Sequence, residues 1–215
     1  MARVKPLGRG GVLWRQARSR PVPVLTTVAL TGTLLGTITR AFGPGVFDAL
    51  RRDPGQLGRG QLWRLVSPVL VQGDHSLPAI IAVFVLCAAI GVAGEWLLPR
   101  AEWVLLYVLG ALAGHGLGEA FQPDQSGMSV AFAGILGGIG ARIMFEPNPR
   151  LKGVRIRFAV LIPLAVLDTA LRDIHGAPFL VGLAVGAWFE RRRRTRSKPT
   201  LAGEQTRVGS SSDRL

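Results

Sequence analysis

Apolar residues along this 215-residue chain are gathered into blocks that approach the length of a membrane span. A bilayer core about 30 Å thick needs about 20 residues of α-helix, because each helical residue rises about 1.5 Å. Six blocks come close to this length, and the last two are the shortest. They cover roughly residues 22–42, 77–98, 103–121, 127–145, 156–171 and 174–189. The pattern therefore predicts an all-α polytopic membrane protein.

The long connection between the first two blocks, residues 43–76, has a different character. It mixes apolar pieces such as "LWRLVSPVLV" with arginine and glycine. A structureless connection of this length is unusual in a compact domain. Apolar segments interleaved with basic residues are typical of amphipathic structure at the membrane interface. We expect an interfacial amphipathic hairpin here.

Composition agrees with a membrane protein, because 48% of the residues are hydrophobic and only 18% are charged. The net charge of +13 is concentrated at the two ends, in "MARVKPLGRGGVLWRQARSR" and "ERRRRTRSK". Basic segments that flank membrane spans orient the chain and attract anionic lipids, so no nucleic-acid partner is expected. We expect a basic N-terminal segment (1–20), a membrane domain (21–190) and a basic, disordered tail (191–215).

The same charges predict the topology. Two basic ends on the cytoplasmic side require an even number of spans, and the basic loop "EPNPRLKGVRIR" falls on that side too. The chain is thus expected in the cell membrane as a multi-pass protein with both termini cytoplasmic. Its excess of arginine over lysine is typical of a GC-rich bacterial genome. The exception is a basic excess in the outer first loop, from Arg51, Arg52, Arg59 and Arg64.

Two polar residues are predicted to share a depth in the membrane. Ser129 lies near the start of the fourth block and His175 near the start of the sixth, each about one helical turn or less inside its span. This topology places both near the outer surface. A histidine within hydrogen-bond reach can take the serine hydroxyl proton and create a nucleophile. Glycines in both blocks, including Gly182 and Gly186 in GxxxG spacing, favour close contact between the two helices. The alternative is that Ser129 only caps its helix or lets it pack closely.

Four segments, in this order, resemble the rhomboid family of intramembrane serine proteases over about residues 60–186. "GQLWRLVSPVL" is similar to the Trp-Arg segment of the family's first loop, and "GEWLLPRAEWVLLYVLGALAG" to its stretch from span two to span three. "GMSVAFAGI" resembles the Gly-x-Ser-Gly nucleophile motif, and "HGAPFLVGLAVG" the histidine helix. The residues in register are Trp63, Arg64, Glu95, Tyr107, Gly110, Gly127, Ser129, Gly134, His175, Gly182 and Gly186.

The resemblance implies a six-transmembrane-helix rhomboid-like bundle with an interfacial first loop. Ser129 would attack the scissile carbonyl of a substrate's transmembrane segment, with His175 as general base and then as acid. The expected partners are transmembrane segments of membrane proteins and the bilayer, including anionic lipids at the basic ends. No cofactor, metal or third acidic residue is implied. Asp168, seven residues before His175, is solvated, pairs with Arg172, or orients or gates the site.

Two departures from the family concern the oxyanion site. Val130 replaces the second glycine of the motif and is expected to crowd the nucleophile. The histidine and asparagine of span two are replaced by Leu77 and Ile81 in one register, or Ala79 and Val83 in another. Losing one oxyanion donor typically costs about 10²–10³ in rate. The candidates that remain for oxyanion or substrate contacts are the backbone N–H of Ser129 at the helix start, Gly127, Gln72, His75 and His115. Otherwise, His115 is a structural histidine bonded to a carbonyl.

Two functions follow from these features. The first is an intramembrane serine endopeptidase that uses a Ser-His dyad. The second is a catalytically impaired pseudoprotease that binds membrane proteins in quality control or trafficking. A small transporter or channel component is less well supported, because the chain has no inverted repeat and little charge at mid-membrane. The single cysteine, Cys87, excludes a disulfide framework or a cysteine-based metal site.

Overall fold

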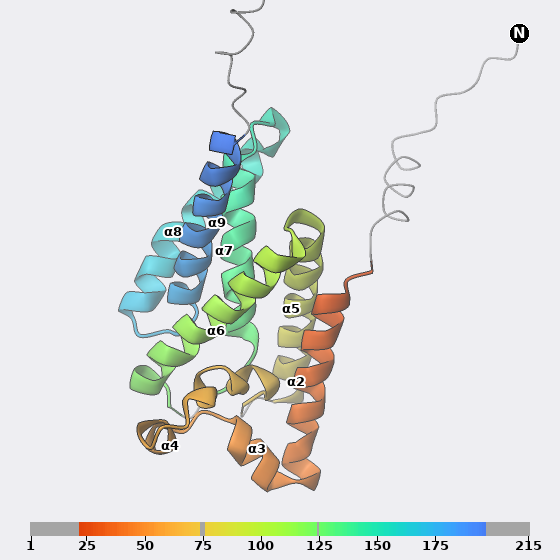
Figure 1. The fold of residues 1–215 in the computed structure, drawn as a ribbon, viewed down its shortest axis with the longest axis vertical. Helices are drawn as coiled ribbons and strands as arrows, with labels where there is room; N and C mark the ends of the chain where they lie inside the picture. Colours follow the sequence, from red (N-terminus) through yellow and green to blue (C-terminus); the bar gives the residue numbers. More distant parts are fainter. Residues whose placement is uncertain (1–21, 74–75, 124, 197–215) are drawn as a thin grey trace, which may run out of the picture.

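The computed structural model describes residues 22–73, 76–123 and 125–196, and within them all regular secondary structure is helical (Figure 1). Each of the six apolar blocks forms a long helix, so the all-α prediction is confirmed. These helices are α2 (Val24–Phe42), α5 (Leu77–Leu97), α6 (Arg100–Phe121), α7 (Ser129–Phe145), α8 (Lys152–Ala170) and α9 (Gly176–Arg196). The N-terminal segment 1–20, His75 and the tail beyond residue 196 lie outside the described residues.

Three helices, α2, α5 and α6, are long and apolar enough to cross a membrane, and α7 is a shorter apolar helix of 17 residues. These four helices agree with a membrane protein. Because α9 continues to Arg196, the prediction of disorder was wrong for residues 191–196. The last turns have partners, since Arg193 pairs with Glu190 and with Glu102 of α6.

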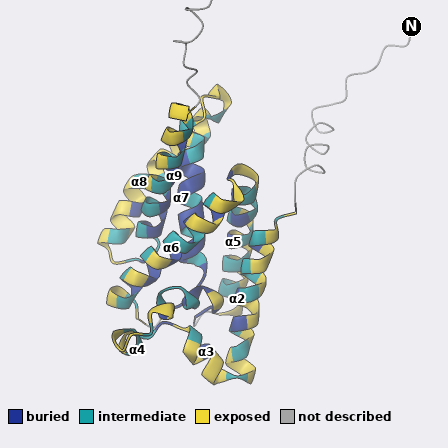
Figure 2. Ribbon diagram, viewed as in Figure 1, coloured by how far each residue is buried: buried dark blue, intermediate teal, exposed yellow. Residues whose placement is uncertain are grey.

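Helix α7 is the centre of the bundle. It packs against α5, α6, α8 and α9, and it runs between α6 and α9 in Figure 1. Ten of its 17 residues are buried, and the dark band along α7 in Figure 2 shows this. The aromatic part of the core lies beside it, where Phe132 meets Trp103 and Tyr107 of α6 edge-on.

Glycines bring α7 into backbone contact with both neighbours. A Cβ placed on Gly137 would lie 2.7 Å from the backbone nitrogen of Leu183 in α9. A Cβ placed on Gly134 would lie 2.6 Å from the carbonyl oxygen of Leu106 in α6. Real Cβ atoms do not come this close, so these positions require glycine. The small-residue pattern therefore produces the close helix packing that it predicts.

The first loop folds into short helical turns on one end of the bundle, rather than into the expected hairpin. They are α3 (Pro44–Leu50), α4 (Pro54–Gly58), η1 (Leu62–Leu65) and η2 (Ser67–Leu70). Arg64, only 6% exposed, holds them together by donating to the carbonyls of Asp48 and Arg51 at 2.8 and 2.7 Å. Trp63 beside it is exposed. Arg52 is buried as well, so two of the four loop arginines are structural.

Glu95 joins α5 to the start of α2. Its carboxylate accepts hydrogen bonds from the backbone N–H groups of Leu25 and Thr26 at 3.2 and 2.7 Å, and from the Thr26 hydroxyl at 2.6 Å. The cap residue of α2, Pro23, offers no side-chain acceptor. A negative group at a helix N-terminus satisfies free N–H groups and opposes the positive end of the dipole. Glu95 thus caps α2 from a neighbouring helix.

Candidate functional site

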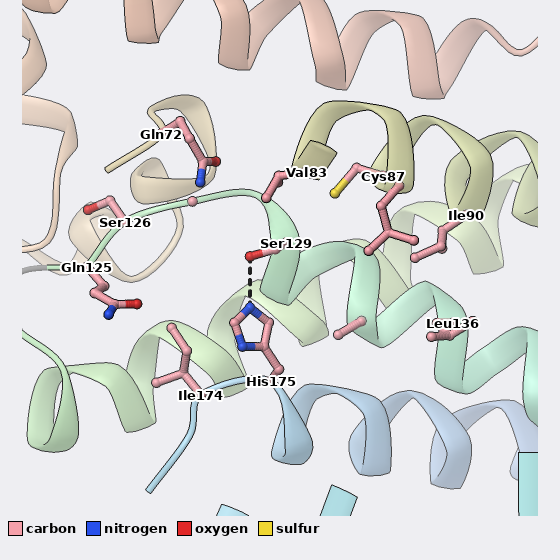
Figure 3. A pocket seen from close by; sticks show the side chains of 13 residues that line it. Gln72, Val83, Cys87, Ile90, Gln125, Ser126, Ser129, Leu136, Ile174 and His175 are labelled. Atoms are coloured by element: carbon pink, nitrogen blue, oxygen red, sulfur yellow. Dashed lines mark hydrogen bonds between the residues drawn. The ribbon is translucent and has the colours of Figure 1, made fainter. Parts of the chain in front are cut away.

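Ser129 and His175 come together at one end of the α7–α9 contact. Ser129 is the first residue of α7, and His175 directly precedes α9. The Oγ of Ser129 lies 2.9 Å from Nε2 of His175, as the dashed line in Figure 3 marks. This is a hydrogen-bond distance between a hydroxyl and the nitrogen that could accept its proton.

Asp173 bonds the other side of the His175 ring, and the sequence reasoning missed it. Its Oδ1 lies 2.8 Å from Nδ1 of His175 and also accepts the backbone N–H of His175 at 2.8 Å. Asp168, the acid considered from the sequence, is exposed on α8 and makes no hydrogen bond with His175. It is not paired with Arg172 either. The sequence did contain one signal for Asp173: it lies just before a predicted helix, where an aspartate often caps free N–H groups.

The electrostatics of Asp173 follow from these contacts. Partial burial raises the pKa of its carboxyl. The hydrogen bonds from the backbone and ring of His175, together with the charge of that ring, lower it by more. The net result is a pKa below the ordinary aspartate value, so the carboxylate is charged at neutral pH.

The dyad opens into a cavity of about 360 Å³ between α5, α7 and the loop that precedes α7. Its walls are mainly apolar, and the polar groups that reach it are the dyad, two glutamines and Ser126. Figure 3 shows how these side chains surround Ser129. The α5 residues in the wall are Val83, Leu86, Cys87 and Ile90, while Gln72, Gln125, Ser126, Gly127, Ala133, Leu136 and Ile174 complete it.

The side-chain amide of Gln72 lies against Gly127 in the loop that precedes α7. It is 2% exposed, and its Oε1 has no hydrogen-bond partner among the described residues. A Cβ on Gly127 would lie 3.0 Å from that Oε1, so the absence of a side chain at Gly127 makes room for the amide. Two backbone contacts fix this approach: Gln72 N–H donates to Thr37 Oγ1, and Gly73 N–H to the Ser126 carbonyl.

The start of α7 offers backbone donors beside the Ser129 side chain. Among the described residues, the N–H groups of Ser129 and Val130 have no hydrogen-bond acceptor, as is usual in a first helical turn. They also lie at the positive end of the helix dipole. A developing negative charge close to Ser129 would therefore meet free donors and a favourable field.

Val130 does not crowd Ser129, so that sequence interpretation was wrong. Its side chain points toward α6 and is absent from the cavity wall. A Cβ added to Gly114 of α6 would lie 2.5 Å from the Cβ of Val130. The missing side chain at Gly114 thus provides the space that Val130 fills.

His115 lies away from the cavity wall and cannot serve as the oxyanion donor there. It is fully buried, and its Nδ1 lies 2.8 Å from Nη2 of Arg52 rather than against a carbonyl. Arg52 also donates to the Gln122 carbonyl at 2.7 Å. Burial lowers the pKa of Arg52, while the charge of Glu119 acts in the opposite direction. His115 is therefore part of the contact that fixes the first loop to α6.

Helix α5 supplies no oxyanion donor. At the positions where the resemblance implies donors, Leu77 and Ile81 are exposed, Ala79 is half-buried, and Val83 contributes an apolar wall. Among the described residues, no group of three His, Cys, Asp or Glu side chains could hold a metal ion.

No protein-family model matches the chain, and neither does any curated protein.

Proposed function

We propose that this protein is a rhomboid-like intramembrane serine endopeptidase that cleaves transmembrane segments with Ser129 and His175. The observation that carries the proposal is the 2.9 Å contact between Ser129 Oγ and His175 Nε2 at the wall of an apolar cavity. A capping serine needs no histidine partner from a distant helix. An activated serine needs an adjacent general base, and a histidine can act as one.

The proposal includes six membrane spans with both termini on the cytoplasmic side. Six long helices are present, and the basic start of α8 and basic end of α9 lie at the end of the bundle opposite the first loop (Figure 1). Basic residues are retained on the cytoplasmic side. The burial of Arg52 and Arg64 supports this orientation, because it removes part of the basic excess of the outer loop.

The geometry suits acyl transfer in two steps. As Ser129 Oγ attacks the scissile carbonyl carbon, His175 Nε2 accepts the hydroxyl proton and a tetrahedral oxyanion forms. Collapse of this intermediate breaks the C–N bond, and His175 returns the proton to the leaving amine. Water then attacks the acyl carbon while His175 accepts a proton from it. Collapse of this second intermediate breaks the C–O bond to Ser129, and His175 returns the proton to Oγ, which releases the acid product and restores the Ser129 hydroxyl.

Oxyanion stabilisation comes from the start of α7 and from the first loop. The free N–H groups of Ser129 and Val130 provide backbone donors, and the Gln72 amide provides a side-chain donor from the neighbouring wall of the cavity. This arrangement replaces the donors that α5 lacks. Removing one such donor costs about 10²–10³ in rate, which is the loss that we expect for Gln72→Ala.

The test is cleavage of a model transmembrane substrate in liposomes by wild type, Ser129→Ala and His175→Ala. The matched control is Ser76→Ala, because Ser76 also lies at the start of a helix but is exposed and makes no side-chain capping bond. We expect product from wild type and Ser76→Ala alone. Equal product from all four proteins would show that the dyad does not cleave the substrate.

The second candidate function is a pseudoprotease that binds transmembrane segments without cutting them. The absence of a polar donor on α5 favours it. In that case a fluorophosphonate probe leaves Ser129 unlabelled, while crosslinking still captures the transmembrane substrate in the cavity. Labelling of Ser129 in wild type, abolished by His175→Ala, distinguishes the protease from this alternative.

A further inference from the structure

We propose that Asp173 is a positioning residue that holds the His175 ring in the orientation and tautomer needed to activate Ser129. This inference rests on the proposed function and goes beyond it, because the resemblance implies a dyad without an acidic third member. The observation is a continuous chain of hydrogen bonds, from Asp173 Oδ1 to His175 Nδ1 and from His175 Nε2 to Ser129 Oγ.

The contacts determine which ring nitrogen carries the proton. A carboxylate oxygen can only accept, so the nitrogen that bonds Asp173 is the one with the hydrogen. In the neutral ring Nε2 then keeps its lone pair, and this lone pair faces the Ser129 hydroxyl. When Nε2 takes the serine proton, the ring becomes positive beside a carboxylate that is already charged. Asp173 thus stabilises both forms of His175 that the reaction uses.

The residue before Asp173 has a strained backbone conformation. Arg172 adopts φ 65°, the left-handed region that residues other than glycine seldom occupy. Partners from the end of α6 hold it there: Gln122 donates to its carbonyl at 3.3 Å, and its guanidinium lies over the Phe121 ring. This turn brings Asp173 back against His175. Such local strain is concentrated at functional sites.

Helix capping alone does not explain the arrangement. Asp173 accepts the backbone N–H of His175 just before α9, and a serine or asparagine could do the same. The second bond, to the ring, is available only to a side chain that reaches Nδ1. The two roles can therefore be separated by a shorter capping residue.

Solvent limits the size of the effect. The side chains of His175 and Asp173 are 41% and 40% exposed, so water can replace part of the contact. We expect Asp173→Ser to slow the reaction of Ser129 on the order of 10- to 100-fold, less than the about 10⁴-fold loss known for a buried triad aspartate.

The experiment compares wild type, Asp173→Ser and Asp168→Asn in detergent. Asp168→Asn is the matched control. This substitution removes the same charge from the adjacent end of α8, at a residue that makes no hydrogen bond with the His175 ring. Ring nitrogens are observed by ¹⁵N NMR, and with only three histidines in the chain a His175→Gln sample assigns the signals. Wild type and Asp168→Asn should show the proton on Nδ1, and Asp173→Ser a mixture of tautomers. The melting temperature of Asp173→Ser should stay near that of wild type.

Fluorophosphonate labelling of Ser129 gives the second readout. Wild type and Asp168→Asn should label at the same rate, with Asp173→Ser slower by the factor given above. An unchanged tautomer and an unchanged rate in Asp173→Ser would reduce Asp173 to a helix cap and overturn the inference. If wild type is not labelled but its tautomer depends on Asp173, the proposed function fails and the positioning role stands.

Discussion

The contact between α7 and α9 sets the distance between Ser129 and His175, and Gly182→Ala tests this. A Cβ at Gly182 would lie 1.9 Å from the carbonyl oxygen of Gly134, whereas real Cβ atoms keep at least 3.0 Å. The helices must therefore separate by about 1.1 Å, the difference between the two values. The obstacle is backbone on both sides, so no rotamer change can relieve it.

A separation of this size would lengthen the 2.9 Å hydrogen bond of the dyad to about 4.0 Å if it carries through to the site, which is beyond hydrogen-bond range. A misplacement of about 1 Å in a reacting pair costs on the order of 10² in rate. We expect Gly182→Ala to slow fluorophosphonate labelling of Ser129 by that factor. Overpacking should also lower stability by about 1–3 kcal/mol, measured by thermal unfolding in detergent.

The control is Gly116→Ala in α6, where an added Cβ meets nothing within 4 Å. It should label like wild type and be slightly more stable, because alanine favours a helix interior by up to about 1 kcal/mol over glycine. Wild-type labelling by a folded Gly182→Ala protein would refute the reasoning that the glycine contact sets the dyad distance.

Three further predictions concern stability. Glu95→Ala removes the cap on α2 and should lower the free energy of unfolding by about 1–2 kcal/mol, as denaturation in detergent would show. Gly118→Ala should destabilise by about 1–3 kcal/mol, because its Cβ would lie within 2.6 Å of Nη2 of the buried Arg52 and displace its hydrogen bonds; an unchanged unfolding curve would contradict this. Because folding lowers the pKa of Asp173, its contribution to stability is present above the unfolded value of about 3.9 and is lost as pH falls through the folded value. Melting temperatures of wild type should therefore fall more steeply than those of Asp173→Asn below about pH 4.

The six helices could be predicted because each contains a long block of mainly apolar residues. The residues at which the helices begin and end could not be predicted. Helix α8 begins at Lys152, about four residues before the apolar block, and α9 continues to Arg196. The apolar block ends at the first charged residues, whereas the helix continues where those residues form ion pairs or hydrogen bonds. Arg193 pairs with acids on α6 and α9, a contact that no local pattern contains.

Part of the site was predictable for a similar reason. Ser129 and His175 could be paired because the charge pattern predicted a shared depth for them and the glycines predicted a close approach of their helices. The capping preference of aspartate could have placed Asp173 at the start of α9. Its contact with the His175 ring could not be predicted, because it depends on a left-handed turn at Arg172 that no residue preference signals. His115 was given a carbonyl partner, whereas its partner is Arg52, 63 positions away in the chain.

The Val130 substitution shows why a motif read residue by residue is a poor guide to this site. In isolation, a valine at the position where the similar motif has glycine, directly after Ser129, suggests a blocked site. Its effect depends on what α6 presents at that depth, and Gly114 leaves the space that the valine fills. The Ser129 side chain leaves α7 in another direction, toward the cavity and His175. Because successive helical residues point about 100° apart, Ser129 and Val130 face different neighbours, and a change at one need not alter the other.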